Sequence, residues 1–226
     1  MKKLVSLLLS MLMICSLAGC GIVIDGEGGS TGSKASGASG AIGLSISTQN
    51  NPFFVTLAEG AKKAAKQAGV PLTVVDASDD ATKQVSDIED LVSKNVSVLI
   101  VNPVDSDAVT GAVEAAIAKG VRVISVDRVV NGVDIDCQIA SDNVAGAELA
   151  TQYIVDTLGE NVKTAELVGT SGASAAIDRS QGFHNIADKK LKVVASQTAD
   201  FDRTGNDRYG EYASGGQQHS GGICRQ

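Results

Sequence analysis

The chain has 226 residues, enough for one or two domains, and its 43% hydrophobic content suits a folded protein with a sizeable core. Its formal net charge of −7 argues against nucleic acid as a partner, because neutralising a phosphate backbone requires clustered positive charge. Aromatic residues make up only 3% of the chain and tryptophan is absent, so each phenylalanine should have an assignable role.

The chain begins with a segment typical of a secretory signal peptide. Two lysines precede an apolar run over residues 4–17, which is too short to cross a membrane comfortably. The run ends in Leu17-Ala18-Gly19-Cys20, which looks like a bacterial lipobox; an ordinary signal with a chance cysteine is the alternative. We expect residues 1–19 to be removed and Cys20 to carry a lipid. The exported protein would then be anchored to the outer face of the bacterial cytoplasmic membrane, or to the periplasmic side of a membrane.

Glycine and serine dominate the residues that follow Cys20. We expect residues 20–40 to comprise the lipidated cysteine and a flexible linker, because such a composition cannot bury enough apolar surface to fold. The folded part should begin near Ala41. The cysteine spacing indicates neither a metal site nor a disulfide framework. Cys137, flanked by Ile135 and Ile139, is expected to be a buried strand residue.

Apolar, β-branched segments alternate with segments of helical periodicity throughout the rest of the chain. We predict strands over 41–47, 72–75, 96–101, 121–126, 164–168 and 193–196, and helices over 55–69, 81–94, 106–119, 144–158 and 174–187. This alternation predicts an α/β fold in which a parallel sheet is covered by helices on both faces. Gly69 and Gly120 follow helical segments and are expected to act as C-caps.

The stretch Thr48-Gln49-Asn50-Asn51-Pro52-Phe53-Phe54 joins the first predicted strand to the first predicted helix. In an open α/β sheet, ligands bind at the edge where strands end and helices begin. Amides can hydrogen-bond a polyhydroxylated ligand, and aromatic faces can pack on its C–H surfaces. The alternative is a simple turn with Pro52 at the first helical position and Phe53 and Phe54 in the core. These residues alone leave both interpretations open.

Asp127 and Arg128 directly follow the fourth predicted strand, at the same edge of the sheet. A carboxylate accepts hydrogen bonds from hydroxyl groups, and a guanidinium donates several in a fixed geometry. The alternative for this pair alone is an ordinary surface ion pair.

Five segments of the chain resemble the sugar-binding proteins of ABC importers, the type I periplasmic binding proteins, in order and spacing over about residues 40–203. The segments are Asn50 to Phe54, Asn102 to Ala108, Val126 to Arg128, Ile139 to Asn143, and Ala199 to Arg203. The resemblance implies two Rossmann-like lobes of doubly wound parallel sheet, joined by a hinge, with sugar in the cleft between them. It implies a first lobe over 41–140, part of a second lobe over 141–203, and a hinge and helix cap at 141–143.

Carried over residue by residue, the resemblance implies seven residues at the sugar: Asn51, Phe53, Phe54, Asp127, Arg128, Arg179 and Phe201. Phe201 and one of the two neighbouring phenylalanines would sandwich the sugar ring from opposite lobes. The assignment of Arg179 to the sugar site depends mainly on the alignment. An arginine near the start of a helix is otherwise commonly a solvated residue. Asp105 and Asp107 are expected to cap the third helix rather than bind ligand, and His184 to lie on a helix without a ligand role.

The function that the resemblance implies is that of a substrate-binding lipoprotein, not an enzyme, which binds D-ribose or a close aldose without a cofactor or metal. Its partners would be the permease of an ABC importer and, as a further candidate, a chemoreceptor, and the protein would be a monomer. The main alternative is a binding protein for another sugar or a sugar-like signalling molecule. A regulator of similar fold would carry an N-terminal helix-turn-helix and basic residues, and an enzyme a nucleophile elbow, a Walker loop or a metal cluster; the sequence contains none of these motifs.

The resemblance ends just after Arg203, where the chain becomes rich in glycine, serine and glutamine. We expect residues 204–226 to be a non-homologous, disordered tail that supplies no core helix or strand. A frameshift or a wrongly assigned gene end would explain the change, and a genuine short variant is the alternative. The second lobe would then be incomplete, and this C-terminally truncated chain would bind sugar weakly or not at all and would aggregate.

Overall fold

The structure is a computed structural model that describes residues 40–202 and 223–225. The predicted signal peptide, the proposed lipidation site Cys20 and the linker as far as residue 39 lie outside the described residues. Residues 203–222, which include most of the predicted tail, also lie outside them.

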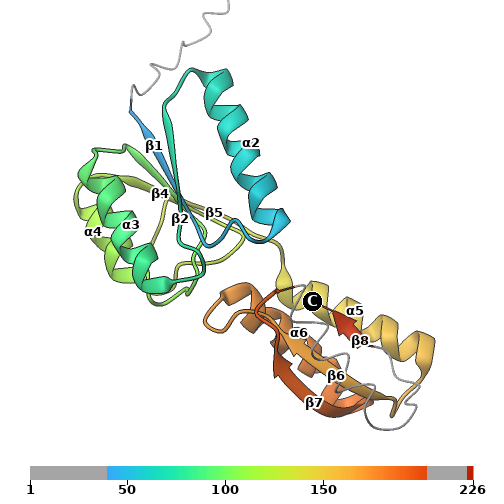
Figure 1. The fold of residues 1–226 in the computed structure, drawn as a ribbon. Helices are drawn as coiled ribbons and strands as arrows, with labels where there is room; N and C mark the ends of the chain where they lie inside the picture. The colour runs from blue at the N-terminus through green and yellow to red at the C-terminus, as the bar shows by residue number, and fades with distance from the viewer. Residues whose placement is uncertain (1–39, 203–222, 226) are drawn as a thin grey trace, which may run out of the picture. The chain divides into compact units, whose positions relative to one another are not determined.

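The described strands form two sheets, and all of their pairings are parallel (Figure 1). The first sheet has the order β2-β1-β3-β4-β5 and the second has the order β7-β6-β8. The strands are β1 (Ile42–Ile46), β2 (Leu72–Asp76), β3 (Val98–Val101), β4 (Arg122–Val126), β5 (Cys137–Ile139), β6 (Lys163–Val168), β7 (Lys192–Thr198) and β8 (Ile223–Arg225). The helices are α2 (Pro52–Ala68), α3 (Ala81–Ser93), α4 (Thr110–Ala118), α5 (Asn143–Leu158) and α6 (Ser174–Lys190).

Helices cover both faces of the first sheet, as predicted (Figure 1). Successive strand residues point to opposite faces, so the apolar strands contribute to two separate cores. Leu44 and Ile46 of β1 pack with Phe54 of α2 on one face. Leu99 and Val101 of β3 belong to the larger core that includes residues of α3 and α4. This two-sided burial explains why these strands are continuous apolar runs rather than alternating ones.

The second sheet has a smaller core, built where α5 and α6 pack together. Its buried residues are Val155, Phe183, Ala187 and Leu191. Gly182 permits the close approach of the two helices, because a Cβ at this position would lie 2.3 Å from the Val144 carbonyl oxygen. The chain passes from the first sheet to the second between β5 and α5, in the segment predicted to contain the hinge.

The tail was expected to supply no core helix or strand; its residues 223–225 form the three-residue strand β8, which pairs with β6. One prediction about the second half of the chain is wrong. Cys137 lies in a strand as predicted, yet it is exposed rather than buried. The reason is that β5 is the edge of the first sheet, where it pairs with β4 and none of its three residues is buried. Flanking isoleucines indicate a strand but do not reveal which strand is at the edge.

Local capping largely follows the sequence. Gly69 takes a left-handed conformation (φ 67°), and its N–H donates to the carbonyls of the last turn of α2, as expected of a C-cap. Gly120, also left-handed, follows the C-cap residue of α4.

Asp105 was expected to cap the third helix at its predicted start, residue 106. Its Oδ1 instead accepts from the N–H groups of Asp107 and Ala108, which caps a turn that precedes α4. Helix α4 itself therefore begins later, at Thr110.

Among the helices of the described ranges, none has the length and apolar character needed to span a bilayer. Within the same ranges, no group of three or more histidine, cysteine or acidic side chains is arranged to hold a metal ion.

Candidate ligand-binding pocket

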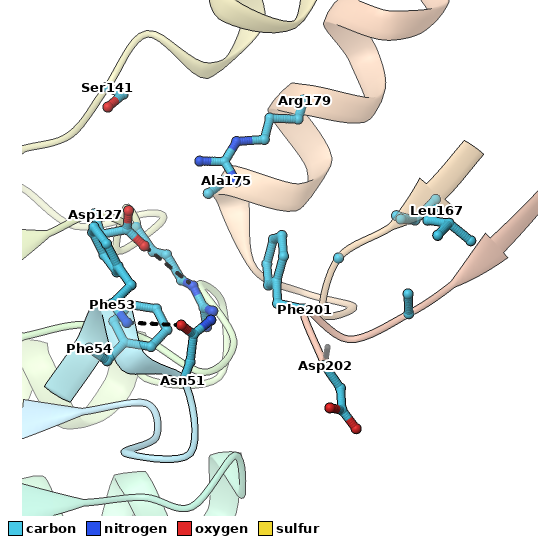
Figure 2. A pocket seen from close by; sticks show the side chains of 14 residues that line it. Asn51, Phe53, Phe54, Asp127, Ser141, Leu167, Ala175, Arg179, Phe201 and Asp202 are labelled. Atoms are coloured by element: carbon cyan, nitrogen blue, oxygen red, sulfur yellow. Dashed lines mark hydrogen bonds and ion pairs between the residues drawn. The ribbon is translucent and has the colours of Figure 1, made fainter. Parts of the chain in front are cut away.

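A cavity of about 330 Å³ lies between residues that follow the strands of the first sheet and residues of the second sheet and α6. All seven predicted sugar-binding residues line it (Figure 2). The other residues that line it are Ser141, Leu167, Val168, Gly169, Ala175, Ala199 and Asp202. Ser141 was predicted as part of the hinge and cap; Asp202 belongs to a segment of the resemblance but was not singled out. The cavity volume lies at the lower end of the range for small-ligand sites.

The stretch before α2 serves both of the roles that the sequence left open. Asn51 is the N-cap of α2, and its Oδ1 accepts a 3.0 Å hydrogen bond from the Phe53 N–H (Figure 2). Pro52 occupies the first turn, as the simple-turn interpretation predicted. Phe54 is core, with 3% of its surface exposed, whereas Phe53 is 55% exposed and lies at the cavity. The two rings meet edge to face, with centroids 5.2 Å apart.

Asp127 stands at the carboxyl end of β4 with a left-handed backbone (φ 67°), which is uncommon for a residue other than glycine. Burial raises the pKa of its carboxyl. The positive charges of Arg128 and Arg179 and a hydrogen bond from the Asn102 side chain act in the opposite direction. The side chain is therefore a hydrogen-bond acceptor held in a partly desolvated site, and backbone strain of this kind often marks functional positions.

The Arg128 side chain is almost completely buried, with 1% of the residue exposed. One terminal nitrogen, Nη1, donates to the carbonyl oxygens of Pro103 (2.8 Å) and Val104 (3.4 Å). The guanidinium carbon lies 5.1 Å from the centroid of the Phe54 ring, within cation–π range. Its Nε is 3.8 Å from Asp127 Oδ2 and has no hydrogen-bond partner among the described residues. Burial lowers the pKa of Arg128, although the charges of Asp127 and Asp79 oppose this shift.

The loop that holds Arg128 is itself fixed by buried amides that the sequence analysis did not identify. Gln84 of α3, fully buried, donates to the Asn102 carbonyl (2.9 Å) and accepts from the Val104 N–H (2.7 Å). The Asn102 Oδ1 accepts from the hydroxyl of Ser47 (2.7 Å), and its Nδ2 donates to the Val126 carbonyl (3.1 Å). These bonds join the ends of β1, β3 and β4, so the arginine is placed by a rigid network.

Arg179 and Phe201 form the opposite wall of the cavity. The Nε of Arg179 donates to Asn143 Oδ1 at the start of α5 (2.9 Å). Figure 2 shows the Arg179 side chain directed from its helix toward Asp127 on the other wall. The guanidinium carbons of Arg128 and Arg179 lie 5.7 and 5.8 Å from the centroid of the Phe201 ring. An aromatic face and three charged groups therefore meet at one cavity.

A serine junction, Ser106 and Ser174, joins the two walls beside the cavity. The N–H of Ser174, the first residue of α6, donates to Ser106 Oγ (3.1 Å), and the Val129 N–H donates to Ser174 Oγ (2.8 Å). The Ser106 N–H donates to the Gly172 carbonyl (2.9 Å). Ser174 thus links the helix that carries Arg179 to the segment that carries Arg128. Single polar residues far apart in sequence give no signal for such a junction.

The chain belongs to the periplasmic binding protein family: the family described as "Periplasmic binding protein domain" matches residues 42–213. This match covers all the described strands and helices except β8. It also continues ten residues beyond Arg203, where we expected the resemblance to end.

Several curated relatives are import binding proteins. The chain is 53% identical over 163 residues to the ribose import binding protein RbsB of Bacillus subtilis (strain 168), covering 72% of this chain and 53% of the relative. It is 38% identical over 167 residues to a D-apiose import binding protein of Actinobacillus succinogenes, covering 72% and 54%. The chain thus spans about half the length of the curated relatives it matches.

Solved structures agree on the fold. The arabinose-transporter binding protein of Shewanella sp. ANA-3, bound to α- and β-L-arabinofuranose, superposes with a TM-score of 0.74 at 29% sequence identity. The superposition covers 79% of this chain and 62% of that structure. This likeness supports the two-sheet parallel α/β architecture described above.

Proposed function

We propose that this protein is the substrate-binding component of an ABC sugar importer and that it binds D-ribose or a close aldose in the cavity between Asp127 and Phe201. The observation that carries the proposal is the composition of that cavity. It combines the ring faces of Phe53 and Phe201 with a partly buried carboxylate and two guanidinium groups. Rings pack on the C–H faces of a sugar, while charged groups exchange hydrogen bonds with its hydroxyls.

The Nε of Arg128 adds a specific argument for a polar ligand. It is a buried donor without a hydrogen-bond partner among the described residues, and such groups are costly unless something satisfies them. A hydroxyl oxygen of a sugar at Asp127 is well suited to accept this hydrogen bond, because the carboxylate lies 3.8 Å from the same nitrogen. One hydroxyl would then donate to the carboxylate and accept from the arginine.

The relatives support the choice of ligand, because those most similar in sequence include import binding proteins named for ribose. A relative named for D-apiose supports the alternative of another small sugar. We further propose export, lipid anchoring through Cys20, the permease of an ABC importer as partner, and a monomeric state; a chemoreceptor is a further candidate partner.

Isothermal titration calorimetry of the chain with D-ribose, D-apiose, D-allose and myo-inositol tests the proposal. We expect D-ribose to bind most tightly, and Asp127→Asn to weaken it, because the amide replaces an acceptor with a donor facing the same hydroxyl. Asp134→Asn, on a loop away from the cavity lining, is the matched control.

The affinity should be lower than that of the Bacillus subtilis relative measured alongside. Among the described residues, the sheet that supports the second wall of the cavity has three strands, whereas the sheet that supports the first wall has five. Equal affinities for all four compounds, or no binding heat from any of them at the highest soluble concentration, would overturn the proposal.

A further inference from the structure

The segment that presents Phe201 to the cavity has an unusual backbone. Asp200 (φ 50°) and Phe201 (φ 56°) are consecutive residues in the left-handed region, although neither is glycine. A bulky residue in this region is a genuine outlier, and such outliers persist only where neighbouring structure holds them. The neighbours here are the last residue of β6 and the loop after it. The Ala199 N–H donates to the Val168 carbonyl (2.7 Å), and Thr170 Oγ1 donates to the Asp200 carbonyl (3.2 Å).

Gly169 lies between those two anchoring residues and directly against the Phe201 ring. A Cβ at position 169 would lie 2.1, 2.3 and 2.5 Å from ring atoms Cζ, Cε1 and Cε2 of Phe201. Three nearly equal distances to adjacent ring carbons place this position over the face of the ring near its tip, not beyond its edge. No side chain other than hydrogen fits there unless the ring moves.

The backbone of Gly169 does not itself require glycine. Its φ lies outside the left-handed region, unlike that of Gly172 in the same loop (φ 79°). An alanine at position 169 would therefore meet no conformational penalty of its own, and its whole effect would fall on the Phe201 ring. The guanidinium groups of Arg128 and Arg179 lie over the same ring at 5.7 and 5.8 Å from its centroid. A displaced ring would alter both of these contacts and the cavity wall.

We infer that Gly169 is a positioning residue for ligand binding: the absence of its side chain seats the Phe201 ring and so sets the aromatic wall of the cavity. The inference rests on the proposed function for its effect on affinity, but the seating of the ring does not depend on the identity of the ligand. It assigns to one glycine of the cavity lining a role that follows from its contact with Phe201.

A double-mutant cycle tests the binding effect. Gly169→Ala should raise the Kd for D-ribose by about tenfold, the order expected when one aromatic contact is lost. Gly146→Ala is the matched control, because Gly146 lies in α5 and nothing is within 4 Å of a Cβ placed there. In a Phe201→Leu background, Gly169→Ala should change the Kd no more than Gly146→Ala does. A full additional loss in that background would overturn the inference, because Gly169 would then act on something other than the ring.

A spectroscopic measurement tests the seating without any substitution at position 169. In the nuclear magnetic resonance spectrum of the chain, the Gly169 α-protons should be shifted upfield by the ring current of Phe201. The shift should disappear in Phe201→Leu and persist in Phe53→Leu. Unshifted α-protons would overturn the inference. If the shift is present but no sugar binds, the seating stands and the proposed function fails; if sugar binds and the shift is absent, the reverse holds.

Discussion

The two walls of the cavity are built differently. On the first wall, Arg128 is fully buried, and the carbonyl oxygens that bind it are fixed by Gln84 and Asn102. On the second wall, Arg179 is held through Nε by Asn143, and Phe201 is held by close contact with a glycine. The first wall is thus preorganised by buried hydrogen bonds, and the second by packing between two short loops. Substitutions should accordingly affect folding at the first wall and binding geometry at the second.

The largest expected effect is at Arg128. Arg128→Met leaves the Pro103 and Val104 carbonyls without their donor and Asp127 without its nearest cation, so the free energy of unfolding should fall by about 3 kcal/mol. Arg179→Met removes one hydrogen bond, to Asn143, and should cost about 1 kcal/mol. Urea unfolding followed by circular dichroism measures both. Equal losses for the two variants would contradict the proposed difference between the walls.

An intermediate effect is expected at Gln84, which is not among the residues that line the cavity. Gln84→Leu keeps the side chain's approximate size but leaves the buried Asn102 carbonyl and Val104 N–H unpaired, at a cost of about 2 kcal/mol. Gln152→Leu is the matched control, because the Gln152 side chain donates to exposed Asp156 within α5 and should change stability by less than about 0.5 kcal/mol. If Gln84→Leu unfolds at the same urea concentration as wild type, the network does not stabilise the first wall.

The smallest effect is expected from His184 on α6. A hydrogen bond that the imidazole donates to Asp188, and then the charge of Glu166, raise the pKa of this imidazole above its ordinary value of 6.5, although partial burial opposes the shift. Because the folded pKa is the higher one, the protonated histidine stabilises the fold fully below pH 6.5, and this contribution is lost as the pH rises through the folded value.

The difference in free energy of unfolding between wild type and His184→Asn should therefore shrink between pH 5 and pH 8. It should also be reduced by salt, because the histidine and Asp188 are partly exposed. A difference that is unchanged or larger at pH 8 would contradict this account. The same pH series should include a variant of Glu166, because its buried carboxylate also accepts hydrogen bonds from the Ser180 and Ser196 hydroxyls at 2.7 Å.

Prediction from sequence succeeded where the signal was local or belonged to a long motif. Phe53 and Phe54 illustrate its limit: the stretch correctly indicated both a helix start and a cavity wall, but not which ring would be buried. That outcome depends on the angle at which α2 packs on β1, which places Phe54 in the core with Leu44. Cys137 was misjudged for a similar reason, because a strand's own residues do not reveal that it lies at the edge of the sheet, as β5 does.

The sequence by itself determined the alternation of strands and helices, the positions of several caps, and seven of the fourteen residues that line the cavity. Periodicity, capping chemistry and family motifs can all be recognised from contiguous residues. Tertiary structure alone decided which residues support that cavity. Gln84, the serine junction and Gly169 act through partners 18 to 68 residues away along the chain. Their roles depend on distances between side chains and loops that only the folded chain brings together.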